Sequence, residues 1–108
     1  EYIHHTGNGD TLIYDTLSGR YFRSSKNAVE TAVNRVNKSL LDEYMMSVND
    51  FYNELEIPTI GAGSLIGWKS DKEMLEVSFE ADVDVNGNPY LVLSYYTRPV
   101  PLYDYSYR

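Results

Sequence analysis

The amino-acid sequence predicts an α+β fold: an N-terminal β-hairpin, then one long and one short helix that pack on an antiparallel sheet. Three observations predict it. Apolar residues recur at helical spacing in the first half of the chain, they alternate at strand spacing in the second half, and a glycine-rich link with the only tryptophan joins the halves. With 108 residues, the chain has the length of a single domain over residues 1–108.

The first elements are short. Residues 1–10 are polar and contain glycine, which is typical of a loose segment ahead of a fold. Two β-prone runs follow, residues 11–15 and 20–23, and the link between them favours a turn because Gly19 can adopt a positive φ. These runs predict the N-terminal hairpin, which we expect at the edge of the main sheet or beside it.

Two helices are expected next. The first covers residues 26–43, where apolar side chains recur at three- and four-residue steps behind a capping serine, Ser24 or Ser25. The second begins at Ser47, with Asp50 three residues later in the place of a capping-box Glu, and it ends before the only Ile-Pro pair. The apolar stripe of the first helix consists of Val29, Ala32, Val33, Val36 and Leu40.

The second half of the chain predicts another hairpin. Residues 74–84 and 89–97 alternate apolar and polar side chains, as strands with one buried face do. A two-residue loop between them would place Ser94 opposite Phe79. A three-residue loop ending at Gly87, with positive φ there, instead sets apolar residues opposite one another. The pairs it predicts are Ala81 with Leu91, Phe79 with Leu93, and Val77 with Tyr95.

One core is expected beneath these elements. The stretch from Ser47 to Trp68 joins the two halves and carries too many apolar residues to remain in water. The tail, residues 99–108, contains two prolines that exclude a central strand, so we expect it to lie extended along a sheet edge. The side chains expected to be buried together are Trp68, Phe79, Val77, Leu93, Val33, Val36 and Phe51.

Composition excludes several kinds of partner and cofactor. The formal charge is -7 and the nine Lys and Arg residues are scattered, so no nucleic acid is expected to bind. The absence of cysteine excludes disulfides and zinc thiolate sites, and no cofactor is predicted. No long apolar run occurs, so we expect a soluble domain without direct membrane contact. Because the chain begins at Glu1 rather than Met, it is expected to be the C-terminal or core part of a longer chain.

The clearest metal-like motif is the acidic end of the second hairpin. Asp82, Asp84 and Asn86, followed by Gly87, match the first half of an EF-hand calcium loop. The last position of such a loop needs a bidentate Glu, and Leu93 stands there. We therefore predict no metal site and interpret the segment as a solvated strand end that leads into a turn.

No catalytic residue is predicted. His4 and His5 are the only histidines, and adjacent side chains in a polar end are unsuited to general-base chemistry or to a metal pair. Residues 61–67 are rich in glycine but lack the lysine of a phosphate-binding loop. The alternative function is therefore a small hydrolase that uses two carboxylates. Its candidate carboxylates are Glu76, Glu80 and Asp82, or Asp50 and Glu54.

Tyrosine is unusually frequent, at eleven of 108 residues. Tyr103, Tyr105 and Tyr107 alternate in the tail, so they project on one side of an extended chain, and tyrosine is enriched where proteins meet. The preferred function is a non-catalytic protein-interaction or structural domain. These three tyrosines would bind the partner, which is another protein or a second copy in a homodimer. The alternative, in which they seal an edge of their own sheet, stays open.

Several short motifs occur in a shared order along most of the chain. They are Gly19-Arg20-Tyr21-Phe22-Arg23-Ser24, the helical residues 28–37, Val48-Asn49-Asp50-Phe51-Tyr52 with Leu55 and Ile57-Pro58, Gly63 with Gly67-Trp68, and the closing hairpin. In this order they resemble small uncharacterised proteins encoded by bacteriophages and prophage-like elements of gut bacteria. Those proteins have Gly where this sequence has Glu56. The resemblance implies a mobile-element origin, and with it the cytoplasm of a bacterial host, but no particular activity.

Overall fold

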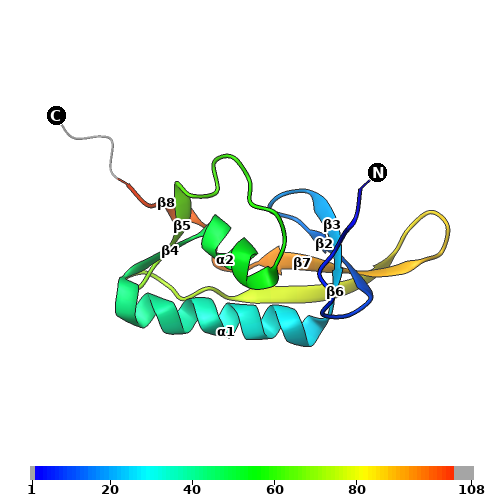
Figure 1. Cartoon of the computed structure of the whole chain (residues 1–108), viewed down its shortest axis with the longest axis horizontal. Helices are drawn as coiled ribbons and strands as arrows, with labels where there is room; N and C mark the ends of the chain where they lie inside the picture. The colour runs from blue at the N-terminus through cyan, green and yellow to red at the C-terminus, as the bar shows by residue number, and fades with distance from the viewer. Residues whose placement is uncertain (1, 104–108) are drawn as a thin grey trace.

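The structure, a computed structural model, describes residues 2–103 and has the predicted α+β class. Two helices and two sheets make up the fold (Figure 1). The elements are β1 (His4–His5), β2 (Thr11–Asp15), β3 (Arg20–Ser24), α1 (Lys26–Glu43), β4 (Met45–Ser47), α2 (Val48–Leu55), β5 (Ile66–Lys69), β6 (Val77–Val83), β7 (Pro89–Tyr95) and β8 (Val100–Pro101).

The larger sheet has the strand order β1-β3-β2-β7-β6 and is mixed, so the prediction of an antiparallel sheet was wrong in this respect. The N-terminal hairpin lies beside the β6–β7 hairpin and joins it through β2, which is central in the sheet and parallel to β7. A parallel pair needs a long crossover, which the two helices between β2 and β7 provide. β1 also pairs in parallel, with β3, where the sequence predicted a loose segment. Its two residues carry no apolar alternation that could have indicated a strand.

The hairpin of β6 and β7 has the predicted register. Ala81 pairs with Leu91, and the ladder continues as far as Val83 opposite Pro89. The N–H of Asp84 then donates to the carbonyl of Asn88 at 2.9 Å, which leaves a three-residue loop. The last residue of that loop is Gly87, whose φ is 83°. The three-residue loop and its positive φ are therefore confirmed.

Both helices occupy the predicted segments, and the caps explain where they begin. Ser25 caps α1, because its Oγ accepts a hydrogen bond from the N–H of Ala28 at 3.0 Å. A full capping box starts α2: the Ser47 Oγ accepts from the N–H of Asp50 at 3.0 Å, and the Asp50 carboxylate accepts from the N–H of Ser47 at 2.8 Å. α2 ends at Glu56, whose φ of 65° lies in the left-handed region.

A second sheet, with the order β4-β5-β8, was not predicted. β4 and β5 approach so closely that a Cβ on Gly67 would lie 2.6 Å from the Cα of Ser47 and would overlap the backbone of Met46. Val100 and Pro101 of the tail form β8, which pairs with β5 at the edge of this sheet, a position that proline tolerates. Leu102 follows β8 and is 4% exposed.

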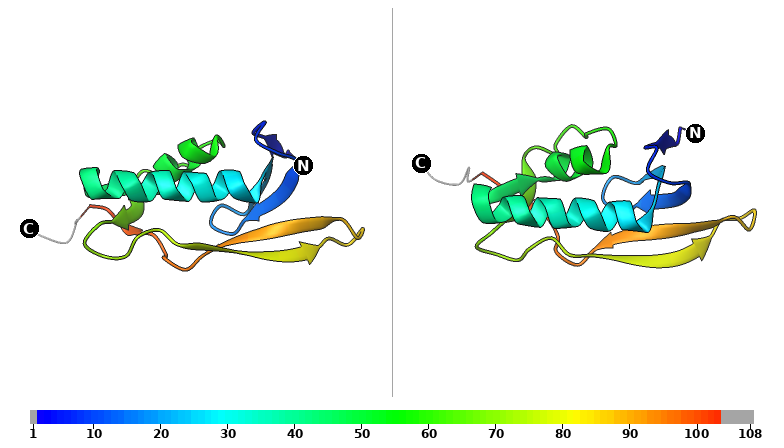
Figure 2. Two further views of the ribbon diagram at one scale, coloured as in Figure 1. Left: turned by 90° about the horizontal axis from the view of Figure 1, so that it is seen from below. Right: turned by 60° about the horizontal axis from the view of Figure 1, so that its bottom comes forward.

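The core lies between the helices and the sheets. Figure 2 shows both helices on the same side of β6 and β7. Phe51 of α2 meets Trp68 edge-on at 6.1 Å, and Trp68 stacks on Tyr95 at 6.4 Å, so three rings join α2 to both sheets. Five of the seven side chains expected in the core are buried, while Val77 and Phe79 pack against it only in part, because β6 is an edge strand. In the described chain neither helix is long and apolar enough to cross a bilayer.

Candidate interaction sites

The tail tyrosines are described at one position only. Tyr103 follows the buried Leu102 and exposes half of its surface. Tyr105 and Tyr107 lie outside the described residues. The proposed row of three partner-binding tyrosines therefore remains a prediction from the sequence.

The acidic end of β6 is organised by the turn. The carboxylate of Asp84 accepts hydrogen bonds from the backbone N–H groups of Asn86 and Asn88 at 2.8 and 2.9 Å, and these bonds lower the pKa of Asp84. Asp82 instead accepts from the backbone N–H of Val83 at 2.8 Å. Over residues 2–103 no group of three or more His, Cys, Asp or Glu side chains is placed to hold a metal ion.

The carboxylates considered for hydrolysis have separate environments. Asp50 belongs to the capping box of α2, and Glu54 forms an ion pair with Arg35 at 3.6 Å on the surface. Glu80 and Asp82 are exposed on β6. Glu76 lines a groove together with Glu30 of α1, a residue that the sequence had not indicated.

β6 is the last strand of its sheet, so among the described elements its outer edge has no partner. Hydrogen bonds at both ends fix the direction of its backbone groups: the Asp84 N–H donates to Asn88 O, and the Tyr96 N–H donates to Glu76 O, each at 2.9 Å. Hydrogen-bonded pairs alternate along an antiparallel ladder, so the even-numbered residues bond β7 and the odd-numbered residues direct N–H and C=O outward. These outward groups belong to Val77, Phe79, Ala81 and Val83.

A groove runs between this edge and α1, with a volume of about 260 Å³. The side chain of Asn37 fixes its end by exchanging two hydrogen bonds of 2.9 Å with the backbone of Leu75. The Lys26 Nζ lies 5.5 Å from the centre of the Phe79 ring. The groove thus lies beside the unpaired edge of β6, and its lining combines apolar side chains with amides and carboxylates. Its lining consists of Glu30, Val33, Asn34, Asn37, Leu75, Glu76, Val77 and Phe79.

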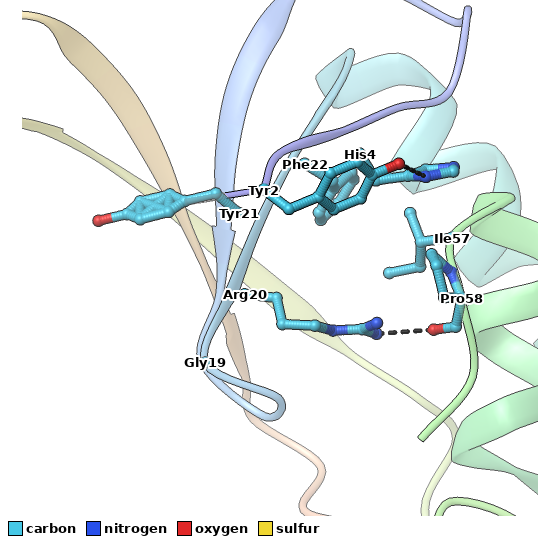
Figure 3. A pocket seen from close by; sticks show the side chains of 8 residues that line it. All are labelled: Tyr2, His4, Gly19, Arg20, Tyr21, Phe22, Ile57 and Pro58. Atoms are coloured by element: carbon cyan, nitrogen blue, oxygen red, sulfur yellow. Dashed lines mark hydrogen bonds between the residues drawn. The ribbon is translucent and has the colours of Figure 1, made fainter. Parts of the chain in front are cut away.

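A different cavity, of about 310 Å³, lies between β1, β3 and the segment after α2 (Figure 3). The Arg20 side chain crosses one side of it, and its Nη2 donates to the carbonyl of Pro58 at 2.8 Å. On another side, the Nε2 of His4 donates to the carbonyl of Glu56 at 2.9 Å, and its Nδ1 accepts from the Tyr2 hydroxyl at 3.1 Å. Phe22 and Ile57 add apolar surface, while the ring of Tyr21 points away.

Next to Arg20, Asp15 is a fully buried carboxylate at the end of β2. One of its oxygens, Oδ2, accepts from the Tyr52 hydroxyl at 2.6 Å and from the backbone N–H and hydroxyl of Ser18 at 3.0 and 2.7 Å. The other, Oδ1, accepts from the Tyr95 hydroxyl at 2.5 Å. Burial, and then the charge of Asp15, raise the pKa values of Tyr52 and Tyr95. All of these donors lie within the fold, so this cluster stabilises the junction of β2, α2 and β7.

Sequence reasoning missed both the cavity and the Asp15 cluster. The cavity has walls from three separate segments, none of which carries a motif of its own. For the cluster there was one signal: an acidic residue closing the otherwise apolar run of β2 in a chain rich in tyrosine. Such an acid is buried only when donors surround it, and tyrosine hydroxyls are suitable donors.

Comparison with known proteins leads to one family. A family model described as a family of unknown function, DUF6353, matches residues 1–106. No curated protein and no solved structure matches the chain. Since the match spans nearly the whole sequence, the chain belongs to the DUF6353 family.

Proposed function

We propose that this domain is a non-catalytic protein-interaction domain that binds its partner along β6. The observation that carries the proposal is the outer edge of that strand beside the α1 groove. Every second residue there, from Val77 to Val83, directs an N–H and a C=O group outward, and among the described elements these groups have no partner strand. An extended segment added there would gain main-chain hydrogen bonds from the edge and would place alternate side chains in the groove.

Charge favours a basic partner over a second copy. Glu80 and Asp82 lie on β6, Glu76 directly precedes it, and Glu30 lines the groove. A second β6 paired with the first would set like charges opposite one another, which is destabilising. A segment with Lys or Arg at alternate positions would instead meet these carboxylates with opposite charge. Self-association through the tail tyrosines is a separate proposal, and partner binding at β6 does not depend on it.

The hydrolase alternative has less support. In one candidate set, Asp50 and Glu54 already have partners in the capping box and in an ion pair. In the other set, Glu76, Glu80 and Asp82 are all exposed to solvent. We also propose that the protein is encoded by a bacteriophage or prophage and acts in the cytoplasm of a bacterial host. Both proposals rest on the resemblance of its sequence to proteins of such elements.

A synthetic extended peptide with alternating Val and Lys tests the proposal by NMR titration of the ¹⁵N-labelled domain. We expect chemical-shift changes in residues 77–83 and in the face of α1 that lines the groove. The same peptide with Glu in place of Lys should bind about tenfold more weakly or not at all at low salt.

The variant Ala81→Pro removes one outward N–H without touching the β7 ladder, and Ala81→Val retains that N–H as a matched control. Binding should be lost in the first variant and kept in the second. Equal binding of the peptide to both variants, or shift changes confined to other surfaces, would refute binding at the β6 edge.

A further inference from the structure

We infer that the cavity between β1, β3 and the segment after α2 binds a small apolar carboxylate, such as an aromatic or branched aliphatic monocarboxylic acid. The inference concerns a surface separate from β6, so it stands or falls independently of the proposed function. Its basis is a fixed guanidinium that has no counter-ion among residues 2–103, at the side of a mostly apolar cavity.

The position of the guanidinium is fixed by three contacts. The Nε of Arg20 donates to the Ser18 hydroxyl at 3.0 Å, and its Nη2 donates to the Pro58 carbonyl at 2.8 Å. Its Cζ lies 5.1 Å from the centre of the Tyr52 ring. The side chain is therefore held in place before a ligand arrives, so little conformational entropy is lost on binding.

The charge of Arg20 has no direct partner in the part of the chain that the structure describes. Within residues 2–103 the single ion pair joins Arg35 to Glu54, so no carboxylate of this segment lies within 4.0 Å of the Arg20 nitrogens. Its Nη1 makes no hydrogen bond to any residue of the same segment. Asp15, its neighbour across the β2–β3 ladder, is satisfied by four neutral donors instead. A carboxylate is the natural complement to an arginine with a free donor edge.

The remaining walls define the rest of the ligand. Phe22 and Ile57 supply apolar surface, and the ring of Tyr2, which is 76% exposed, stands at the mouth. The two nitrogens of His4 are already engaged by Tyr2 and Glu56. The cavity has one charged group, few further polar groups and a volume of about 310 Å³. These properties suit a small monocarboxylic acid, whereas a sugar or a nucleotide would need more polar partners.

The probe for this site is 3-phenylpropanoate, with the neutral 3-phenylpropanamide as its matched analogue, titrated by NMR into the ¹⁵N-labelled protein. For so small a ligand we expect a dissociation constant in the millimolar range. The shifts should change in residues 19–22 and 57–58. The amide should bind about tenfold more weakly, because it lacks the charge-assisted hydrogen bond.

Three variants complete the test. Arg20→Gln should weaken binding of the acid about tenfold and should bring the acid and the amide to equal affinity. Arg23→Gln is the matched control, because Arg23 lies on the other face of β3 and also donates to one backbone carbonyl, that of Asp10, at 2.8 Å. Its affinity for the acid should be unchanged. Tyr2→Ala removes an exposed wall and should weaken binding severalfold without affecting the fold.

If Arg20→Gln does not fold, two measurements still test the inference. They are the affinity of Tyr2→Ala for the acid and the ratio of the affinities of the unmodified protein for the acid and the amide. The inference is overturned by equal binding of acid and amide to the unmodified protein, by shift changes away from the cavity, or by no binding up to about 10 mM.

Discussion

At the scale of single residues, Asp15 is the side chain with the most demanding environment. A buried carboxylate is costly unless hydrogen bonds replace its lost water, and here two tyrosine hydroxyls and Ser18 replace it. These donors come from a turn, from α2 and from β7. The cluster therefore forms only when these elements have assembled, so it selects one arrangement of them.

Removing one donor tests this role. Tyr52→Phe keeps the ring but leaves Asp15 with one hydrogen bond fewer, and we expect the free energy of unfolding to fall by about 1–3 kcal/mol. Urea unfolding followed by tryptophan fluorescence would measure it. Tyr96→Phe is the matched control, since Tyr96 is 70% exposed, and it should change stability by less than about 0.5 kcal/mol. Equal effects of the two variants would contradict a structural role for the cluster.

The same tyrosines predict a dependence on alkaline pH. Their pKa values are raised in the folded protein, whereas the unfolded chain ionises tyrosine near pH 10. Above that pH the folded state binds more protons than the unfolded state, so stability falls as the pH rises, while below it the tyrosines contribute no slope. Each tyrosine adds a slope of about 1.4 kcal/mol per pH unit.

Unfolding curves recorded between pH 8 and about pH 11 would show this loss. In Tyr52→Phe the decline should be shallower by roughly the contribution of one tyrosine. An identical pH profile for the variant and the unmodified protein would mean that the Tyr52 hydroxyl is not protected in the fold.

Local rules explain which of these residues were predictable. Ser25, Ser47 and Gly87 were foreseen because a cap or a turn depends on neighbours within a few positions. Asp15 was not, because Tyr52 and Tyr95 lie 37 and 80 positions away in the sequence. A hydrogen bond over such a separation depends on the tertiary fold, which leaves no periodic pattern.

At the scale of elements, the β4–β5 contact depends on a missing side chain. Gly67→Ala would place a methyl group against the backbone of Met46 and Ser47, so the strands would have to separate. We expect a loss of more than about 3 kcal/mol, measured by thermal or urea unfolding. Gly61→Ala is the control, because nothing lies within 4 Å of its Cβ, and it should be neutral or slightly stabilising. A folded Gly67→Ala with unchanged stability would contradict this close approach.

Periodic elements were predictable and short ones were not. α1 and the β6–β7 hairpin repeat their apolar pattern over several turns or pairs, which fixes both type and register. Pro89 is compatible with this register as well. It lies opposite Val83 in a pair that makes no hydrogen bonds between β6 and β7, so the N–H that proline lacks is not needed there. β1, β4 and β8 have only two or three residues, and β2 has the same alternation whether its neighbour is parallel or antiparallel.

At the scale of the whole molecule, deletions in the tail distinguish two roles: stabilising its own fold and joining two copies. Deleting residues 102–108 removes Leu102, which is buried and whose N–H donates to the carbonyl of Leu65 at 3.0 Å. We expect a loss of about 2–4 kcal/mol, close to the effect of truncating a core leucine. Thermal unfolding measures the loss.

A shorter deletion, of residues 104–108, is the matched control, because it removes Tyr105 and Tyr107 and keeps Leu102 and Tyr103. If those tyrosines join two copies, sedimentation should show a dimer that becomes a monomer of nearly the same melting temperature. A full deletion that left both mass and stability unchanged would remove the tyrosine-rich tail from any account of binding.

The single tryptophan gives this fold a built-in optical reporter. Trp68 is buried, donates its Nε1–H to the carbonyl of Thr97 at 2.8 Å, and stacks on Tyr95, which also bonds Asp15. Its emission therefore reports whether the two sheets and α2 are packed together. Because the chain has no second tryptophan, the whole signal comes from this one site. A ligand in the Arg20 cavity or a strand on β6 would leave this emission unchanged, whereas separation of the two sheets would shift it to the red.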